Sequence, residues 1–427
     1  MHIPNKKILS FLLACSLFSA VPLGNYSRAA ETTETAKDQS LDTTSAYQNL
    51  INTMKSATNS SLILLMRSAP NQEGSFIETS QGAMFQLTSG DYLKNGWAKI
   101  KNQIYYFDKN GCLKTGWLAW QKKWYYLKKD GTLASNLWVT NGSQRWYVQE
   151  DGTRATGFVK YKKYTYYFNS FGSMVKGLRV INGKIYFFRE NGTMATGWKC
   201  LSKKVYYFTQ DGSAATGWTE INGSWYYFGA DGAMTTGWKY VDGYKFYFGT
   251  DGKMVQDVDK LIGKQSSYRI TVNRVKCQVT VYAANETGNY CIPVKTFTCS
   301  VGKAGTPTHA GTYATLKKQN PVELMGSSWG KYGTQINNYG DWFHSVACSN
   351  PDPTYALAAG NYNMLGQPAS HGCVRLCVRD AKWIYDNCGL YTRVDISDTE
   401  YTPFDKAPTI KIPASQNWDP TDADAKR

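Results

Sequence analysis

Apolar and polar positions repeat with a fixed period through the middle of the chain, where short aromatic runs alternate with polar turns. Typical runs are Tyr-Tyr-Phe at 206–208 and at 226–228, each followed by an Asp-Gly pair. Asp-Gly and Asn-Gly pairs tolerate positive φ and favour tight β-hairpins. Eight turn glycines lie 20 or 21 residues apart, at Gly111, Gly131, Gly152, Gly172, Gly192, Gly212, Gly232 and Gly252. The pattern predicts about eight hairpin repeats of 20 residues within 91–258.

A single two-stranded hairpin is marginally stable in water, so the repeats must stack and bury their aromatic faces, as in a solenoid. In the run at 226–228 the outer two side chains face one way and Tyr227 faces the other. One set can build the core, while the other stays near solvent and offers its rings to sugars or cations. Candidate binding residues of this kind are Trp198, Trp218, Trp225, Trp238, Tyr207 and Tyr227. The alternative is that these side chains serve only the core.

The segments outside the repeats differ in composition. Residues 1–30 begin with a short basic stretch, continue with an apolar run and offer small residues for cleavage, which predicts a secretory signal peptide. Residues 31–90 are rich in Thr and Ser and predict a spacer with a short helix at 46–54. Residues 399–427 contain four prolines and predict a flexible tail. No later apolar run approaches the ~20 residues that span a membrane, so we expect a secreted protein without a membrane span.

The charge of the chain changes the expected partner. A net charge of +16 and a pI near 9.2 favour a polyanionic ligand. For a secreted protein, teichoic acid or another wall glycan fits this charge better than nucleic acid, and the sequence contains no nucleic-acid-binding motif. The expected location is the cell wall or cell surface.

Residues with catalytic potential are concentrated in the C-terminal portion, where three of the four histidines lie. His371, Gly372, Cys373 and Arg375 fall close together in the sequence. A cysteine is a nucleophile only as the thiolate, and a nearby imidazole, cation or set of backbone N–H groups favours that anion. Gly372 permits a close backbone approach, so amides next to it are candidates for an oxyanion site. The stretch predicts a Cys373 nucleophile with a histidine brought close by the fold.

Other interpretations of these residues were weighed against a catalytic one. Most cysteines are structural, and a free cysteine is among the most buried residue types. Cysteine peptidases of the cell-wall amidase kind usually place Cys before His, and sortases place Arg further beyond Cys, so both fit less well. No Cys-x-x-Cys or His-x-x-x-His pair occurs, and we expect neither a metal nor another cofactor. Disulfide pairing among the other cysteines stays open.

Residues 264–398 resemble the L,D-transpeptidases of bacterial cell-wall synthesis. The resemblance rests on an upstream His344-Ser345 pair and on the run Ser-His-Gly-Cys-Val-Arg at 370–375. It implies a β-rich catalytic domain that acts on the stem peptides of peptidoglycan through a thioester.

The same resemblance assigns roles to individual residues. His344 would be the general base, oriented by the main chain of Ser345, and Cys373 would be the nucleophile. His371 would support the thiolate, and Arg375 would hold an anionic group of the donor or acceptor.

Two features depart from the family pattern. His344 and Cys373 are 29 positions apart, which is longer than the usual spacing and predicts an enlarged lid or substrate loop within 345–369. His309 stands where the family often has Pro, and we expect it to be a loop residue rather than a catalyst.

The repeats resemble cell-wall-binding repeats related to choline-binding and glucan-binding modules. The cation cage of the choline-binding version commonly has Trp directly before the Tyr-Tyr pair, and here only Trp124 and Trp225 occupy that position. The sequence therefore leaves the preference between choline and another wall glycan open.

Taken together, these patterns predict a mainly β protein in which a hairpin solenoid precedes a β-rich L,D-transpeptidase domain. The expected function is an exported enzyme that cross-links or remodels peptidoglycan stem peptides and is anchored to the wall by its repeats. The acceptor, whether amine, water or D-amino acid, stays open. The alternative is a non-catalytic surface protein that binds wall or glycan and carries a decayed transpeptidase domain.

Overall fold

The structure is a computed structural model that describes residues 62–350 and 356–425. The expected signal peptide and the helix expected at 46–54 lie outside the described residues. The described chain forms two compact units: one reaches Leu137 and also holds Val148–Thr153, and the other holds Trp138–Tyr147 and the chain from Arg154 onward. Among the described residues, no helix has the length and apolar character needed to cross a membrane.

The first unit begins earlier than the predicted repeats. Helix α2 spans Leu62–Ser68, and β1 (Gly74–Thr79) pairs with β2 (Gly82–Leu87) inside the segment expected to be a spacer. The hairpins of the predicted repeats are each followed by one of the periodic turn glycines, mostly in an Asp-Gly or Asn-Gly pair, whereas β2 is followed by Ser89-Gly90, so the repeat pattern did not reveal this hairpin. The remaining hairpins of this unit are β3 (Gly96–Ile100) with β4 (Gln103–Phe107), and β5 (Gly116–Trp120) with β6 (Lys123–Leu127).

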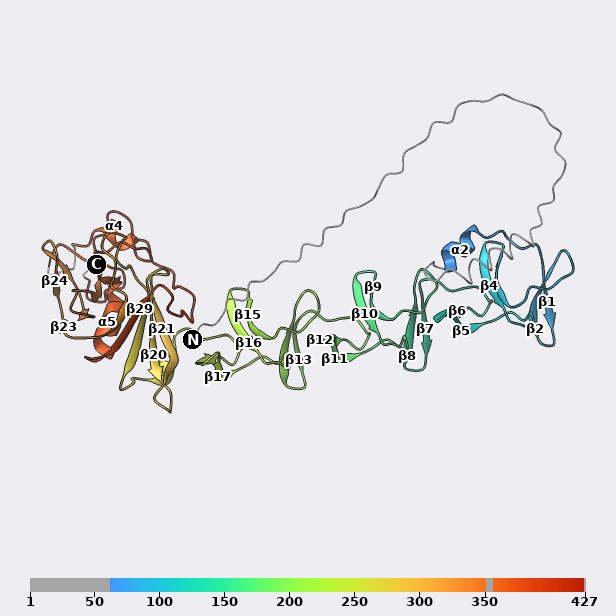
Figure 1. Ribbon diagram of the computed structural model, residues 1–427, viewed down its shortest axis with the longest axis horizontal. Coiled ribbons are helices and arrows are strands. Elements are labelled where there is room, and N and C mark those ends of the chain that lie inside the picture. The colour runs from blue at the N-terminus through green and yellow to red at the C-terminus, as the bar shows by residue number, and fades with distance from the viewer. Residues whose placement is uncertain (1–61, 351–355, 426–427) are drawn as a thin grey trace, which may run out of the picture. The chain divides into compact units, whose positions relative to one another are not determined.

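The predicted hairpin repeats continue in chain order (Figure 1). The last residue of each hairpin's second strand is buried in the core from β10 (Tyr164–Phe168) onward. These residues, each at most 1% exposed, are Phe168, Phe188, Phe208, Phe228 and Phe248. The hairpins are β7 (Leu137–Asn141) with β8 (Gln144–Val148), β9 (Gly157–Tyr161) with β10 (Tyr164–Phe168), β11 (Gly177–Ile181) with β12 (Lys184–Phe188), β13 (Gly197–Leu201) with β14 (Lys204–Phe208), β15 (Gly217–Ile221) with β16 (Ser224–Phe228), and β17 (Gly237–Val241) with β18 (Tyr244–Phe248).

Backbone hydrogen bonds join each hairpin to the next. The amide of Met234, which follows the turn after β16, donates to the carbonyl of Val205 in β14 over 2.8 Å, and Met254 repeats this contact with Trp225 over 2.8 Å. A side chain at the turn glycine would block the stacking, because a Cβ on Gly212 (φ 82°) would lie 2.3 Å from Sδ of Met194. The fixed 20-residue period therefore reflects a repeated contact between neighbours.

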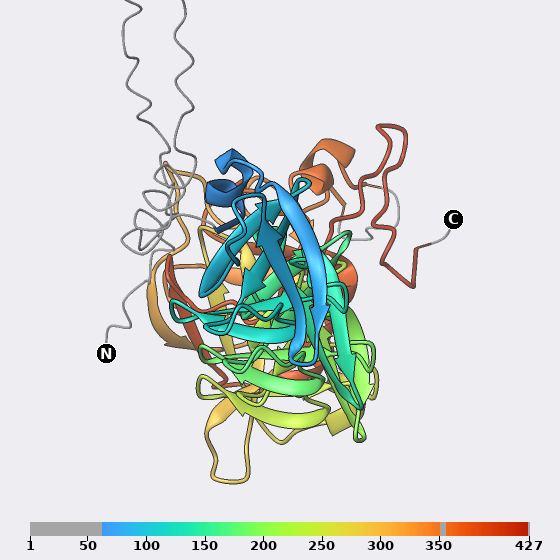
Figure 2. The same ribbon diagram turned by 90° about the vertical axis from the view of Figure 1, so that its right-hand side faces the viewer.

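The C-terminal domain follows helix α3 (Asp259–Ile262) and contains two sheets. The first has the strand order β21-β20-β19-β29-β22, with β19 and β29 parallel and the other pairs antiparallel. The turn between β20 and β21 lies at the lower edge of the domain in both views (Figures 1 and 2). The strands are β19 (Tyr268–Asn273), β20 (Gln278–Ala284), β21 (Tyr290–Thr298), β22 (Gly311–Ala314) and β29 (Arg393–Ser397).

The second sheet has the order β23-β26-β27-β28 and carries the candidate catalytic residues. Helix α5 (Val378–Asn387) packs between the two sheets, with Ala381 and Ile384 buried in the main core. The elements are β23 (Lys318–Gln319), β26 (Gly333–Gln335), β27 (Trp342–Ser345) and β28 (Val374–Leu376), with the separate hairpin of β24 (Val322–Leu324) and β25 (Ser328–Gly330) and the short helix α4 (Ala359–Asn363).

The C-terminal segment differs from the flexible tail that its prolines predict. It has no regular element between 398 and 425, yet Phe404 and Ile412 are buried. Asp419 accepts a hydrogen bond from the amide of Val378 at the start of α5 over 2.8 Å, and Asp422 pairs with Lys331 over 2.6 Å. The segment is held because its apolar side chains are buried and its acidic side chains contact the C-terminal domain.

Candidate active site

Two parallel strands bring the predicted catalytic residues together. In the pairing of β27 with β28, His344 lies opposite Arg375, and Cys373 directly precedes β28. The chain between the two strands can be long without moving these residues apart, because the strand register sets their positions. The expected loop at 345–369 accordingly contains α4 and residues 351–355, which lie outside the described chain.

These residues line one pocket of about 320 Å³. It brings together four of the predicted site residues, His344, His371, Cys373 and Arg375. Sequence reasoning missed several further lining residues, among them His309, Glu323, Tyr339, Asp341 and Trp342. Because they come from separate loops and strands, only a motif shared with known relatives could have indicated them.

The imidazole of His344 is buried and held in one tautomer. Its Nδ1 lies 2.5 Å from the carbonyl oxygen of Ser345, and since a carbonyl can only accept, Nδ1 carries the proton and Nε2 is left with its lone pair. Burial, together with the charge of Arg375, lowers the pKa of His344 to about 4. The ring is therefore neutral at neutral pH and able to accept a proton at Nε2.

The main chain of Ser345 contacts the imidazole of His344 through its carbonyl, and Lys331, between β25 and β26, holds Ser345 in place. The amide of Ser345 donates to the carbonyl of Lys331 over 3.0 Å, and the amide of Lys331 donates to Oγ of Ser345 over 2.8 Å. Gly330 leaves room for the imidazole, because a Cβ there would lie 2.8 Å from Nδ1 of His344.

The thiol of Cys373 is neutral in the resting site. Burial raises its pKa to about 11; the backbone N–H of Trp342 and the charge of Arg375 favour the thiolate, and Asp341 disfavours it. The sequence predicted a stretch whose imidazole and cation favour the anion, whereas in the structure desolvation outweighs them. The thiolate therefore has to form by proton transfer when a substrate is bound.

Gly372 is required by its surroundings. It has φ 123°, and a Cβ there would lie 2.7 Å from Oδ1 of Asp341. Its amide donates to Oγ of Ser370 over 3.3 Å, and its carbonyl accepts from Oγ1 of Thr308 over 2.5 Å. Gly372 therefore shapes the turn before Cys373, while the amides nearest the sulfur belong to Trp342 and Cys373 itself.

Arg375 presents a cationic group to the pocket. Its Nη1 donates to the carbonyl of Ala369 over 3.2 Å. Its Nε is buried and has no hydrogen-bond partner in the described part of the chain. A buried donor without a partner is costly, so an anionic or carbonyl group of a ligand would be favoured beside it.

His309 lies in a loop, as expected, and its side chain lines the pocket. Its Nδ1 is 2.9 Å from Oδ2 of Asp341, and its ring stacks on Tyr339 at a centroid distance of 4.5 Å and an interplanar angle of 16°. The local sequence gave no signal for this contact, because His309 and Asp341 are 32 residues apart.

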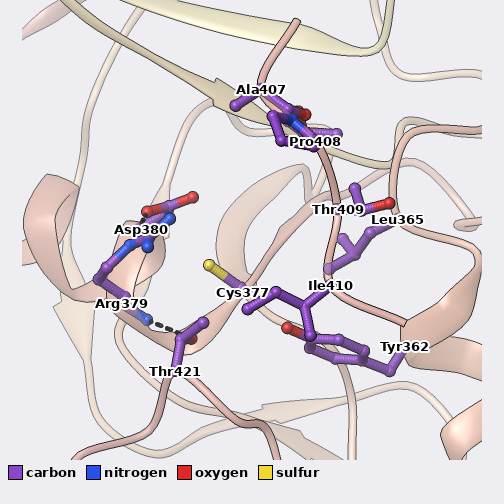
Figure 3. Close-up of a pocket in the computed structure, with 11 residues that line it drawn as sticks. Tyr362, Leu365, Cys377, Arg379, Asp380, Ala407, Pro408, Thr409, Ile410 and Thr421 are labelled. Carbon is purple, nitrogen blue, oxygen red and sulfur yellow. Dashed lines mark hydrogen bonds and ion pairs between the residues drawn. The ribbon is translucent and has the colours of Figure 1, made fainter. Parts of the chain in front are cut away.

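A second, smaller cavity of about 120 Å³ contains none of the candidate catalytic residues (Figure 3). The sulfur of Cys377 points into it, between Tyr362 and the C-terminal segment at 407–410. Burial raises the pKa of Cys377 to about 12, so this thiol is a poor nucleophile at neutral pH.

The aromatic candidates of the repeats have different surroundings. Trp198 is 38% exposed and contacts Tyr207 and Tyr226 at centroid distances of 5.0 and 5.1 Å. Trp238 is equally exposed, but Nζ of Lys245 lies 5.7 Å from its ring centroid, so an internal cation covers it.

Trp218 and Trp225 line a pocket together. Their rings are nearly perpendicular at a centroid distance of 6.4 Å, and Tyr227 packs on Trp218 at 5.4 Å. Together with Met254 and residues 401–405 of the C-terminal segment, they line a pocket of about 260 Å³. Nε1 of Trp225 donates to Oδ2 of Asp405 over 2.7 Å, which places a carboxylate beside the rings.

Comparison with known proteins agrees with the division of the chain. A family model of the L,D-transpeptidase catalytic domain matches residues 267–396. A model of the choline-binding repeat matches residues 94–138, 155–197, 175–216, 195–236 and 215–257.

Individual relatives match parts of the chain. The Bacillus subtilis (strain 168) protein named "Putative L,D-transpeptidase YciB" is 40% identical over 68 residues, which are 16% of this chain and 34% of that protein. The chain thus matches about a third of the length of that relative.

Solved structures with similar repeats come from Streptococcus pneumoniae. The choline-binding domain of CbpL is 29% identical with a TM-score of 0.35, covering 43% of this chain and 98% of that one. CbpJ is 23% identical with a TM-score of 0.34, covering 51% of this chain and 93% of that one. The two family models and the strands described above show that this mainly β protein carries choline-binding repeats followed by an L,D-transpeptidase catalytic domain.

Proposed function

We propose that the protein is an exported peptidoglycan L,D-transpeptidase that joins stem peptides through a thioester on Cys373. The observation that carries the proposal is the shared pocket, in which a neutral His344 with its lone pair on Nε2 and a partly buried Arg375 accompany the Cys373 thiol. The match to the catalytic-domain model over 267–396 supports the same reaction class.

In the first half-reaction, His344 acts as the general base. Its Nε2 takes the thiol proton as Sγ of Cys373 attacks the peptide carbonyl that precedes the terminal residue of the donor stem. The amides of Trp342 and Cys373, which already favour negative charge on the sulfur, are placed to stabilise the oxyanion. The C–N bond then breaks, and the leaving amine takes the proton back from His344.

Arg375 and His371 are the remaining pocket residues with a proposed role. Arg375 offers its buried Nε to a carboxylate or carbonyl of the donor, and His371 supports the thiolate from the turn before Cys373. In the second half-reaction an acceptor attacks the thioester carbonyl, the C–S bond breaks, and the thiol is restored.

The reaction is tested by incubating the full chain with purified muropeptides and measuring cross-linked products by mass spectrometry. We expect Cys373→Ser to abolish cross-linking, because a hydroxyl in this pocket lacks the thiol's accessible anion. Cys377→Ser is the matched control, since that thiol lines the other cavity, and it should leave cross-linking intact. Equal activity of wild type and Cys373→Ser would refute the proposal and favour a wall-binding protein with an inactive domain.

For the repeats we propose attachment to the wall through teichoic acid or another glycan that carries organic cations. The match to the choline-binding repeat model supports this, as do the two perpendicular tryptophans and the carboxylate of Asp405 in one pocket. Aromatic faces and a carboxylate are suited to a quaternary or primary ammonium group.

A further inference from the structure

His309 is tied to the catalytic turn by a direct contact. Oγ1 of Thr308, the residue before His309, donates to the carbonyl of Gly372, the residue before Cys373, over 2.5 Å. His309 and Cys373 are therefore each one residue from a bonded pair, and both line the same pocket. The position of His309 relative to the nucleophile is set by this contact and not by a freely moving loop.

Asp341 holds the imidazole of His309 in one orientation. Oδ2 of Asp341 accepts from the backbone amide of His309 over 3.1 Å, lies 2.9 Å from its Nδ1, and also accepts from Nδ2 of Asn337 over 2.9 Å. These three contacts fix the position of the Asp341 carboxylate, which is 2% exposed. A carboxylate accepts, so Nδ1 of His309 carries its proton and Nε2 is left with a lone pair.

The surroundings of His309 differ from those of His344. The side chain of His309 is 45% exposed, with Tyr339 stacked on one face and a carboxylate at Nδ1, whereas His344 is buried against a neutral carbonyl. The contact at Nδ1 orients the ring of His309 and leaves it open to a group that arrives from solvent, whereas the ring of His344 is enclosed. The pocket thus contains two imidazoles suited to different proton transfers.

The second half-reaction needs a base that the acceptor can reach from solvent, as it can reach His309. An acceptor amine is an ammonium ion at neutral pH, with an ordinary pKa of about 10.4 for a lysine-like group, and must lose a proton before it can attack. His344 is buried against the carbonyl of Ser345, while the acceptor arrives from solvent.

We propose that His309, oriented by Asp341, is the general base that takes the proton from the acceptor amine. This inference rests on the proposed transpeptidase function and deepens it, because it makes an amine the acceptor. Nε2 of His309 removes one proton from the ammonium group, the amine nitrogen attacks the thioester carbonyl, and the C–N bond forms as the C–S bond breaks. The thiolate leaves and takes up the amine's second proton, and the imidazolium of His309 releases its proton to solvent.

Two substitutions separate this role from a structural one. Nδ2 of Asn occupies roughly the place of Nδ1 of His, so His309→Asn keeps a donor for Asp341 but has no base. His309→Gln loses the donor as well. The full-length proteins are given a donor muropeptide first and an amine acceptor second, and intact-protein mass spectrometry follows the thioester while product analysis follows the cross-link.

For His309→Asn we expect thioester formation at the wild-type rate and a melting temperature like that of the wild type. Transfer to the amine should fall by on the order of 10²-fold, as expected for loss of a general base, so that the thioester accumulates. His309→Gln should show the same transfer defect with a lower melting temperature.

Three results would overturn the inference. The first is transfer by His309→Asn at the wild-type rate. The second is an equal loss of thioester formation and of transfer in His309→Asn. The third is a defect in His309→Gln alone, because it would mean that His309 has only a structural role. A wild-type protein that forms no thioester would instead refute the proposed function itself. The two failures are therefore distinguishable.

Discussion

At the scale of single residues, the site depends on backbone positions as much as on reactive side chains. Gly372, which directly precedes Cys373, has a positive φ, and a Cβ on it would lie 2.7 Å from Oδ1 of Asp341. The sequence indicated a close backbone approach or a positive φ at Gly372, and the structure has φ 123° there with Oδ1 of Asp341 close by.

We expect Gly372→Ala to displace the turn that carries Cys373. The added methyl group would meet Oδ1 of Asp341 at 2.7 Å, and a displacement of about 1 Å can cost on the order of 10²-fold in rate. Cross-linking by purified full-length protein measures the effect. Gly326→Ala is the matched control, because Gly326 also has positive φ but no atom within 4 Å of the added Cβ. Similar activity of both variants would contradict the steric explanation.

Some residues of the site could be predicted from the sequence, and others could not. Cys373, His371 and Arg375 could be predicted because they share one short motif, and His344 because the motif's relatives have an upstream histidine. Asp341 and His309 could not be predicted, because their contact depends on how two loops meet and neither loop carries a local pattern for it.

At the scale of elements, the 20-residue period predicted the hairpins from β3 to β18, but it misplaced their turns. The expected hairpin-turn glycines lie after the second strand of each hairpin: Gly212 follows β14, whereas the β13–β14 turn has positive φ at Ser202 and Lys203. The β1–β2 hairpin is not followed by an Asp-Gly or Asn-Gly pair, and its two strands meet through Phe76 and Phe85 at a ring distance of 5.0 Å. The C-terminal segment was likewise misjudged, because its order comes from partners far away in the sequence.

We expect Phe404→Ala to destabilise the protein, because Phe404 is 4% exposed and packs on Phe246 at a ring distance of 6.3 Å. Removing a buried Phe side chain costs about 3–5 kcal/mol. Phe171→Ala is a matched control, since Phe171 is 75% exposed in a repeat turn and should change stability little. Thermal unfolding of both variants compares them. Equal melting temperatures would mean that the C-terminal segment is not held as described.

At the scale of the whole molecule, the last choline-binding repeats and the L,D-transpeptidase catalytic domain share contacts. Tyr401 stacks on Tyr244 of β18 at 4.6 Å, and Tyr240 of β17 donates to Glu286, which follows β20, over 3.4 Å. Trp225 and Asp405 add a contact between a repeat and the C-terminal segment. The last repeat is therefore part of the surface on which the catalytic domain rests.

We expect replacement of Trp218 and Trp225 with Ala together to weaken sedimentation of the full chain with purified cell walls. The reason is that these two residues line the aromatic pocket beside Asp405. Trp238→Ala should have a smaller effect, because Lys245 already covers that ring. Release of wild-type protein by free choline would indicate that an organic cation is the ligand. Unchanged wall binding by the double variant would contradict the assignment of this pocket.

The central claim is that Cys373 becomes acylated by a peptidoglycan stem peptide. The most direct test is mass spectrometric mapping of the acyl group after full-length protein is mixed with a donor muropeptide and digested at low pH to preserve the thioester. We predict one acylated peptide, containing Cys373, and none in the His344→Ala variant on the same timescale. An acyl group on Cys348 or Cys377, or no acylation of any cysteine while cross-links form, would contradict the account.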